Sequence, residues 1–77
     1  MVNRISYRLR YALHEGKQAE RLAALDELAD LVHGSPIRVA YEARVLLMRF
    51  QDNRDEKFRQ RVVDLIVEID ELIRETR

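Results

Sequence analysis

The chain of 77 residues contains no cysteine, one proline and two glycines. The absence of cysteine excludes disulfides, thiol catalysis and thiolate metal sites, and it suits a reducing compartment, so a cytoplasmic location is expected. With so few helix-breaking residues, no segment resembles a linker or a low-complexity tract. Residues 1–77 are therefore expected to form a single helical domain.

The chain also lacks an excess of charge, with 14 basic residues against 14 acidic ones. A net charge of zero argues against general binding to nucleic acid or membranes, although it leaves room for a local basic patch. No apolar run approaches the roughly 20 residues of a membrane span. A domain this short buries only about 60% of its unfolded surface, so its stability is marginal unless association adds to it.

Apolar periodicity predicts an all-α fold of two antiparallel helical hairpins. The four helices are expected over residues 3–14, 17–33, 36–51 and 54–75. Asn3 is expected to cap the first helix and Ser35 the third, with Pro36 in the first turn. Asn53 and Glu56 have the spacing of a variant capping box for the fourth helix.

Residues 3–33 can form either one long helix or two shorter ones. The apolar stripe of the first part, which includes Ile5 and Leu9, points roughly 150° away from that of the second part. A straight rod would leave one stripe exposed, and Gly16 lies where a turn is needed. A turn at Gly16 is the favoured reading. A continuous helix remains the alternative if a partner chain covers the first stripe.

The segment Pro36–Gln51 is apolar on nearly every side, and only Arg38, Glu42 and Arg49 form a coherent polar stripe. A helix that is apolar all round is a buried helix. This segment is therefore predicted to be the centre of the fold, wrapped on several sides by the other helices. The residues expected inside include Ile37, Tyr41, Leu46, Leu47, Met48 and Phe50.

The two halves of the chain resemble each other. Residues 4–13 align with residues 38–47 at an offset of 34, with Arg, Tyr, Arg and Leu recurring identically. The apolar stripe of the second helix maps onto that of the fourth at an offset of 37. The chain can thus be two copies of one hairpin, although chance similarity between amphipathic helices is the alternative. One such hairpin cannot bury its own apolar face.

The segments ERLAALDELADLVHGSP and DEKFRQRVVDLIVEI resemble the HEAT family of helical repeats. Phe58-Arg59 stands where that family has Val-Arg, and Ile37-Arg38 similarly follows the preceding turn. HEAT arrays serve as protein-binding scaffolds, so the resemblance implies a non-enzymatic interaction role. Two repeats are fewer than the three or more usually needed for stability, which points to self-association or to a compact four-helix bundle.

No catalytic, cofactor or metal site is expected. The chain has no Gly-rich phosphate loop, no nucleophile elbow and no zinc motif. Asp26, Asp30 and His33 fall on neighbouring helical turns, but a bundle metal site needs a second set of ligands. We interpret these residues as a solvated acidic face with a histidine favoured by the helix dipole.

The basic first helix is the best candidate for a functional surface. Tyr7 and Tyr11 lie one turn apart, beside arginines that can contact protein, phosphates and bases, or anionic lipid. Plain packing under a neighbouring helix is a further alternative. On the fourth helix, two valines lie off the main apolar stripe. The predicted interaction surface comprises Arg4, Tyr7, Arg8, Tyr11, Val63 and Val67.

The sequence therefore predicts a non-enzymatic protein-interaction module that forms a homo-oligomer, with no cofactor and no membrane contact. One alternative is a small nucleic-acid-binding protein that uses the basic, tyrosine-containing first helix. Another is an artificial, designed helical bundle with no natural partner.

Overall fold

The computed structural model describes residues 5–76, and this part of the chain contains four α-helices and no strand. The all-α prediction is confirmed. The helices are α1 (Tyr7–Glu15), α2 (Gln18–His33), α3 (Ile37–Met48) and α4 (Glu56–Thr76).

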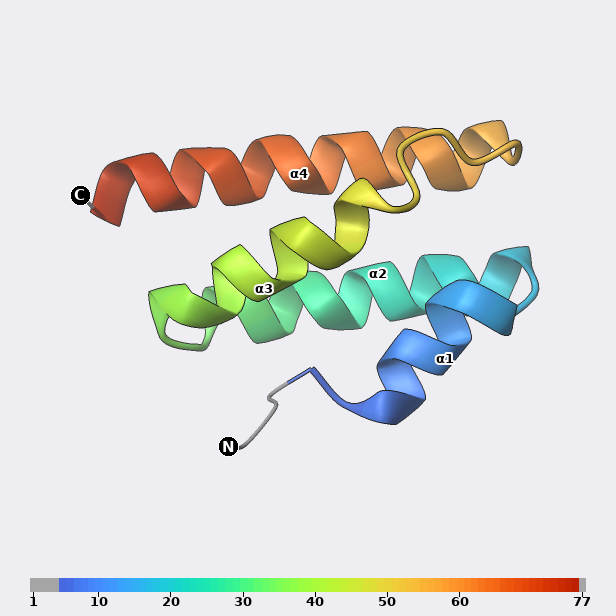
Figure 1. Ribbon diagram of the computed structural model, residues 1–77, viewed down its shortest axis with the longest axis horizontal. Coiled ribbons are helices and arrows are strands. Elements are labelled where there is room, and N and C mark those ends of the chain that lie inside the picture. The colour runs from blue at the N-terminus through green and yellow to red at the C-terminus, as the bar shows by residue number, and fades with distance from the viewer. Residues whose placement is uncertain (1–4, 77) are drawn as a thin grey trace.

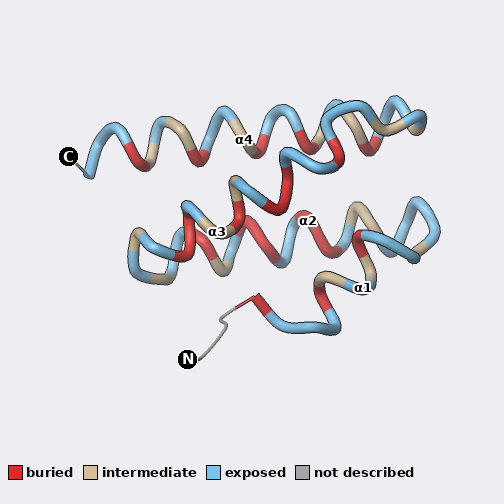
Figure 2. The backbone as a smooth tube through the Cα atoms, viewed as in Figure 1, coloured by how far each residue is buried: buried red, intermediate tan, exposed pale blue. Residues whose placement is uncertain are grey.

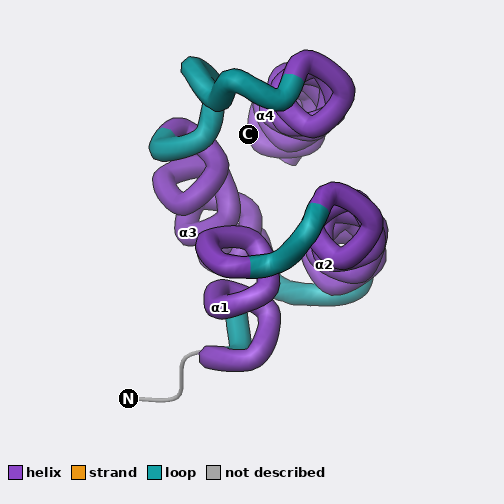
Figure 3. The backbone as a smooth tube through the Cα atoms, turned by 90° about the vertical axis from the view of Figure 1, so that its right-hand side faces the viewer, coloured by secondary structure: helices purple, strands orange, loops and turns teal. Residues whose placement is uncertain are grey.

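The helices form two antiparallel hairpins, α1–α2 and α3–α4, stacked on one another (Figure 1). Seen end-on, α1 and α3 occupy one layer while α2 and α4 occupy the other (Figure 3). Helix α2 contacts the other three helices, and α3 and α4 contact each other closely. No Cα of α1 lies within 8 Å of a Cα of α3 or α4, so α1 is fixed mainly by its hairpin partner.

The buried residues form a single core cluster, and every helix contributes buried positions to it (Figure 2). Leu46, Leu47 and Phe50 are all buried, as predicted for the core side of this segment. The Phe50 ring meets that of Phe58 edge-on, with centroids 5.7 Å apart. The largest fully buried side chains are Phe58, Ile5, Leu13, Leu25, Leu28, Leu47, Leu65, Ile69, Val32, Val39 and Val62.

The favoured turn at Gly16 is confirmed. The Gly16 amide donates to the Ala12 carbonyl at 2.9 Å, which closes α1. The Glu20 carboxylate then accepts from the Lys17 amide at 3.1 Å and opens α2. Because the chain folds back here, the α1 stripe of Ile5, Leu9 and Leu13 is buried within the molecule. The first stripe therefore does not need a partner chain, and it gives no support to self-association.

The predicted start of the first helix was too early. Ser6 is the N-cap, and its Oγ accepts a hydrogen bond from the Leu9 amide at 3.2 Å. The predicted cap, Asn3, lies outside the described residues. Ile5 is buried ahead of the helix, because an apolar residue just before the cap can anchor the entering chain.

The predicted bounds of the third helix were also wrong. Pro36 takes the N-cap position without a side-chain bond, so Ser35 does not cap this helix. At the other end α3 stops at Met48, three residues earlier than expected. From there the amides of Arg49 and Phe50 bond three residues back, to Leu46 and Leu47. These tighter turns carry the Phe50 side chain into the core.

Asp55, and not Asn53, caps the fourth helix. The Asp55 carboxylate accepts from the Phe58 amide at 3.2 Å. Asn53 supports the turn instead, because its side-chain oxygen accepts from the Asp55 amide at 2.9 Å. An ionised carboxylate at this position also complements the positive end of the helix dipole.

Burial follows the internal repeat. Ile5 and Val39 are both buried, as are Leu13 and Leu47, while Tyr7 and Tyr41 are both exposed. Along the second pair of helices, the aligned pairs Leu25 and Val62, Leu28 and Leu65, and Val32 and Ile69 are also buried. The two hairpins therefore bury equivalent positions of the aligned segments.

Candidate protein-interaction surface on α3 and α4

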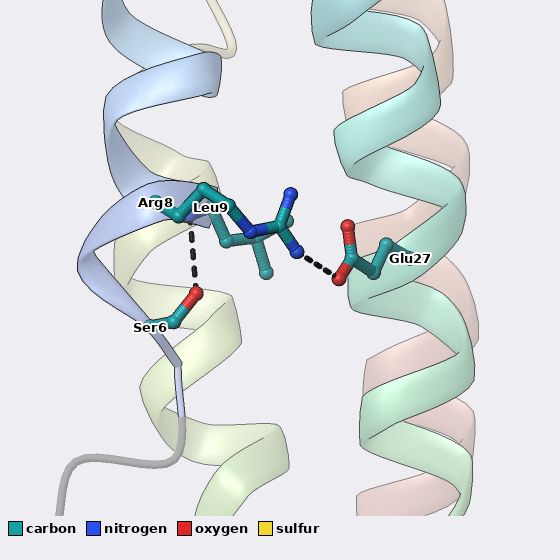
Figure 4. Close-up of polar contacts among 4 residues, drawn as sticks. All are labelled: Ser6, Arg8, Leu9 and Glu27. Atoms are coloured by element: carbon teal, nitrogen blue, oxygen red, sulfur yellow. Dashed lines mark hydrogen bonds and ion pairs between the residues drawn. The ribbon is translucent and has the colours of Figure 1, made fainter.

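The predicted N-terminal surface is exposed but partly engaged within the chain. Tyr7 and Tyr11 point away from the core, 79% and 57% exposed, with ring centroids 6.2 Å apart. Arg8 reaches across to α2 and forms an ion pair with Glu27 at 2.5 Å (Figure 4). Arg4 lies outside the described residues. The basic first helix thus uses Arg8 for pairing with the acidic second helix inside the molecule.

Val63 and Val67 are exposed on α4, at 39% and 51%. They lie on a different helix from Tyr7 and Tyr11, and α1 has no close backbone contact with α4. Figure 1 shows α1 and α4 at opposite edges of the molecule. The structure therefore does not bring the two halves of the predicted interaction surface together.

Helix α3 is not buried on every side, which corrects the sequence interpretation. Tyr41 is 45% exposed, Met48 is 42% exposed and Val45 is 62% exposed. Ile37 is only partly buried against the core. At about 100° per residue, the three exposed side chains lie roughly opposite the buried Ala43 and Leu47 stripe. An apolar face of α3 is therefore directed to solvent.

An ion pair fixes the register between α3 and α4. The Arg44 Nε donates to the Asp70 carboxylate at 2.6 Å, and the Arg44 Nη1 lies 3.4 Å from the Met48 sulfur. The two helices are antiparallel, so Met48, one turn after Arg44, lies level with Val67, about one turn before Asp70.

The exposed large apolar residues of α3 and α4 are named together here as the α3–α4 face. It comprises Tyr41, Val45, Met48, Val63 and Val67, which are between 39% and 62% exposed.

Val45 is the residue that sequence reasoning missed. The apolar runs of α3 made every side of the helix look buried, but a short two-hairpin chain has too few neighbours to cover all sides. A signal that this side is not fully buried is Arg44, which lies one turn from both Tyr41 and Met48 on the helix surface, because arginine is almost never fully buried unless it is paired.

A hollow of about 670 Å³ lies between the N-terminal ends of α2 and α4. Several of its polar groups bond to one another or to groups beside it. Gln18 donates to both carboxylate oxygens of Asp55 at 3.0 and 3.1 Å, and Gln60 donates to Asp64 at 3.0 Å. Arg61 pairs with Asp26 at 3.2 Å. The bonds of Gln18 to Asp55 and of Arg61 to Asp26 join α2 to the N-terminal part of α4, so the hollow belongs to the packing between these two helices.

Replacing Asp55 with asparagine is expected to make the free energy of unfolding depend less on pH under acidic conditions. The pKa of the Asp55 carboxyl is lowered from its usual value, first by the Gln18 hydrogen bond and then by the Phe58 amide. The ionised Asp55 carboxylate therefore stabilises the fold at pH values above the unfolded pKa of about 3.9. This stabilisation is lost as the pH falls through the lower pKa of the folded state.

Urea unfolding of the wild type and Asp55→Asn at a series of pH values measures this effect. The stability advantage of the wild type should shrink between about pH 4 and pH 2. Asp52→Asn, which changes an exposed aspartate in the same loop, is the matched control and should show no such change. An advantage that stays constant or grows in acid would contradict the assignment of Asp55.

Comparison with protein-family models, with curated proteins and with solved structures found no match. Within the described residues, none of the helices has the length and apolar character to cross a bilayer. Over the same residues, no three histidine, cysteine, aspartate or glutamate side chains gather closely enough to hold a metal ion. The surface chemistry of the fold is thus the basis for assigning a function.

Proposed function

We propose that this protein is a non-enzymatic interaction module that associates with a second copy of itself through the α3–α4 face. The observation that carries the proposal is the exposure of five large apolar side chains, Tyr41, Val45, Met48, Val63 and Val67, on the two helices of one hairpin. Single exposed apolar residues are normal on protein surfaces, but a larger exposed apolar area is typical of an interaction site.

The charges within the α3–α4 face support the same reading. Arg44 and Asp70 already pair with each other at 2.6 Å. Covering the face therefore leaves neither charge without a counterion, which is the condition for burying charges at an interface without a large penalty. Tyrosine and methionine are also enriched at interface cores.

The stacking of the two hairpins is typical of helical-repeat proteins, in which each hairpin buries its faces against neighbouring hairpins. Here α2 packs on both α3 and α4. This arrangement fits the HEAT-like reading, in which such hairpins serve as protein-binding scaffolds.

A nucleic-acid-binding role for α1 has weaker support. The exposed pair of Tyr7 and Tyr11 could stack on bases. However, Arg8 is held by Glu27 at 2.5 Å, so a phosphate would have to displace a carboxylate before it could bind this arginine. We therefore favour protein contact.

The double variant Val45→Lys/Val67→Lys is expected to weaken self-association. Both positions are more than half exposed, so the fold should tolerate lysine, while two charges at the centre of an apolar interface raise the dissociation constant by about 100-fold or more. Light scattering coupled to size-exclusion chromatography measures the change across a concentration series. The wild type should reach the dimer mass at high concentration, and the variant should stay monomeric.

Tyr7→Ser is the matched control, because it removes an exposed aromatic side chain from a different surface. It should dimerise like the wild type. The proposal fails if the wild type is monomeric at several hundred micromolar concentration, or if the lysine variant dimerises equally well. Circular dichroism of each variant checks that helicity is retained.

A further inference from the structure

We infer that the groove between α1 and α3 binds an extended, acidic segment of a partner protein. This α1–α3 groove is a hollow of about 240 Å³ lined by Arg10, Glu42, Val45, Leu46 and Arg49. The two helices lie in the same layer (Figure 3), and no Cα of one lies within 8 Å of a Cα of the other. The inference goes beyond the proposed self-association and does not depend on it.

The Glu42 carboxylate sets the first requirement on the occupant. Its Oε2 atom is buried and has no hydrogen-bond partner among the described residues. A buried carboxylate oxygen without a donor is costly. An occupant that offers an N–H group to this oxygen therefore forms a charge-assisted hydrogen bond that the free protein lacks.

The arginines around the groove set the second requirement. Arg10 and Arg49 line it from α1 and from the end of α3. Arg38 is exposed one turn before Glu42 on the surface of α3. Over the described residues, Arg38 and Arg49 form no ion pair. These charges favour carboxylates in the occupant and oppose a cationic donor such as a lysine side chain.

The distribution of charge over the whole molecule favours the same kind of partner. Without counting histidine, α1 and α3 together carry four arginines against two glutamates. Helices α2 and α4 together carry ten carboxylates against five basic residues. An acidic segment is therefore attracted towards the layer that contains the α1–α3 groove and repelled by the other layer.

A polypeptide meets both requirements. Its backbone offers a neutral N–H at every residue except proline, and an extended segment leaves these groups available, whereas a helix uses most of them internally. One N–H can donate to Glu42 while acidic side chains reach Arg38 and Arg49. The phosphodiester backbone of a nucleic acid offers only acceptors, so it would leave Glu42 unpaired and be repelled by it.

The size and floor of the groove also suit a short stretch of polypeptide. A volume of about 240 Å³ is smaller than the roughly 300–1,000 Å³ of small-molecule sites. Leu46 is buried and Val45 is exposed, so the apolar part of the groove can receive an aliphatic side chain. The expected segment thus alternates acidic and aliphatic residues, because successive side chains of an extended chain point to opposite sides.

NMR titration of the ¹⁵N-labelled protein with a short peptide of alternating glutamate and leucine tests this inference. Val45 also belongs to the α3–α4 face, so the titration uses a concentration at which light scattering shows the monomer. We expect the largest shifts at Glu42, Val45 and Arg49. Arg49→Glu should raise the dissociation constant of the peptide by about 2- to 20-fold, because attraction is replaced by repulsion.

Arg74→Glu is the matched control for Arg49→Glu. It makes the same change in net charge at an exposed arginine of α4, and it should have a clearly smaller effect on the dissociation constant. Equal effects of the two substitutions would show that net charge alone attracts the peptide, and they would overturn the assignment to the α1–α3 groove.

Glu42→Ala separates hydrogen bonding by the carboxylate from simple repulsion. Loss of the acceptor should raise the dissociation constant by about fivefold or more. The fold should be retained, because alanine favours helix and the substitution removes an unpaired buried oxygen; circular dichroism checks this. If Glu42 were only a negative charge beside an acidic peptide, the substitution would lower the dissociation constant, and the inference would be wrong.

Other probes test the class of partner. The inference is overturned if the glutamate–leucine peptide causes no shifts, or if the same peptide with lysine in place of glutamate binds equally well. Tighter binding of oligothymidylate in the groove would assign it to nucleic acid instead. None of these results bears on self-association, because each titration is made on the monomer.

Discussion

Replacing Phe58 with alanine is expected to lower the free energy of unfolding by about 3–5 kcal/mol. Phe58 is fully buried, meets Phe50 edge-on, and carries the Arg21 guanidinium 5.3 Å above its ring centroid. A chain of this size has a total stability of about 4–12 kcal/mol. The variant should therefore lose much of its folded population, as measured by urea unfolding followed by circular dichroism.

Val63→Ala is the matched control, because it also shortens an apolar side chain on α4 but at an exposed position. It should change the free energy of unfolding by less than about 1 kcal/mol. If Phe58→Ala costs no more than Val63→Ala, the assignment of Phe58 to the core is wrong.

Replacing Gly16 with alanine is the second change with a large expected effect. A Cβ at this position would lie 2.4 Å from the Ala12 carbonyl oxygen and 3.0 Å from the Glu20 Cβ. The backbone angle φ of Gly16 is −72°, so the residue is required for space and not for a left-handed conformation. We expect a loss of about 1–3 kcal/mol, typical of overpacking, measured by thermal unfolding.

Gly34→Ala tests whether this effect is specific to the first turn. A Cβ at Gly34 would meet only the Asp30 carbonyl oxygen, at an ordinary 3.5 Å. Alanine should therefore be neutral or stabilising there, by up to about 1 kcal/mol, because it restricts the unfolded chain. Equal effects of the two substitutions would contradict the role assigned to Gly16.

The existence and order of the helices could be predicted from the sequence because apolar residues recur with helical spacing, and because Gly16 and the Gly34–Pro36 turn interrupt that spacing. The helix ends could not be predicted as well. Asn3 and Ser6 are both favourable N-cap residues for α1, and Asn53 and Asp55 are both favourable N-cap residues for α4. The choice is made by contacts distant in sequence, such as the bond from Gln18 to Asp55.

The exposed side of α3 was missed because the prediction counted apolar residues and not the neighbouring helices available to cover them. Tyr41 and Met48 lie on a helix whose other side holds Leu46 and Leu47 inside the core. The packing of the hairpins determines which of the two apolar sides is covered. On α4 the apolar stripe is narrower, so Val63 and Val67 could be recognised as lying outside it.

The predicted site on α1 illustrates a different limit. The sequence indicates a basic helix followed by an acidic one, and this leaves pairing within the chain and pairing with a partner equally possible. The ion pair of Arg8 with Glu27 shows that this charge contrast is used inside the molecule. Apart from Tyr7 and Tyr11, the large apolar residues that are exposed in the described part of the chain lie on α3 and α4.

The most direct test of the proposed association is a dilution series of the wild-type protein followed by ¹H–¹⁵N NMR. We expect concentration-dependent shifts at Tyr41, Val45, Met48, Val63 and Val67, while Tyr7 and Tyr11 stay unchanged. Shifts confined to α1, or spectra that do not change with concentration, would contradict association through the α3–α4 face.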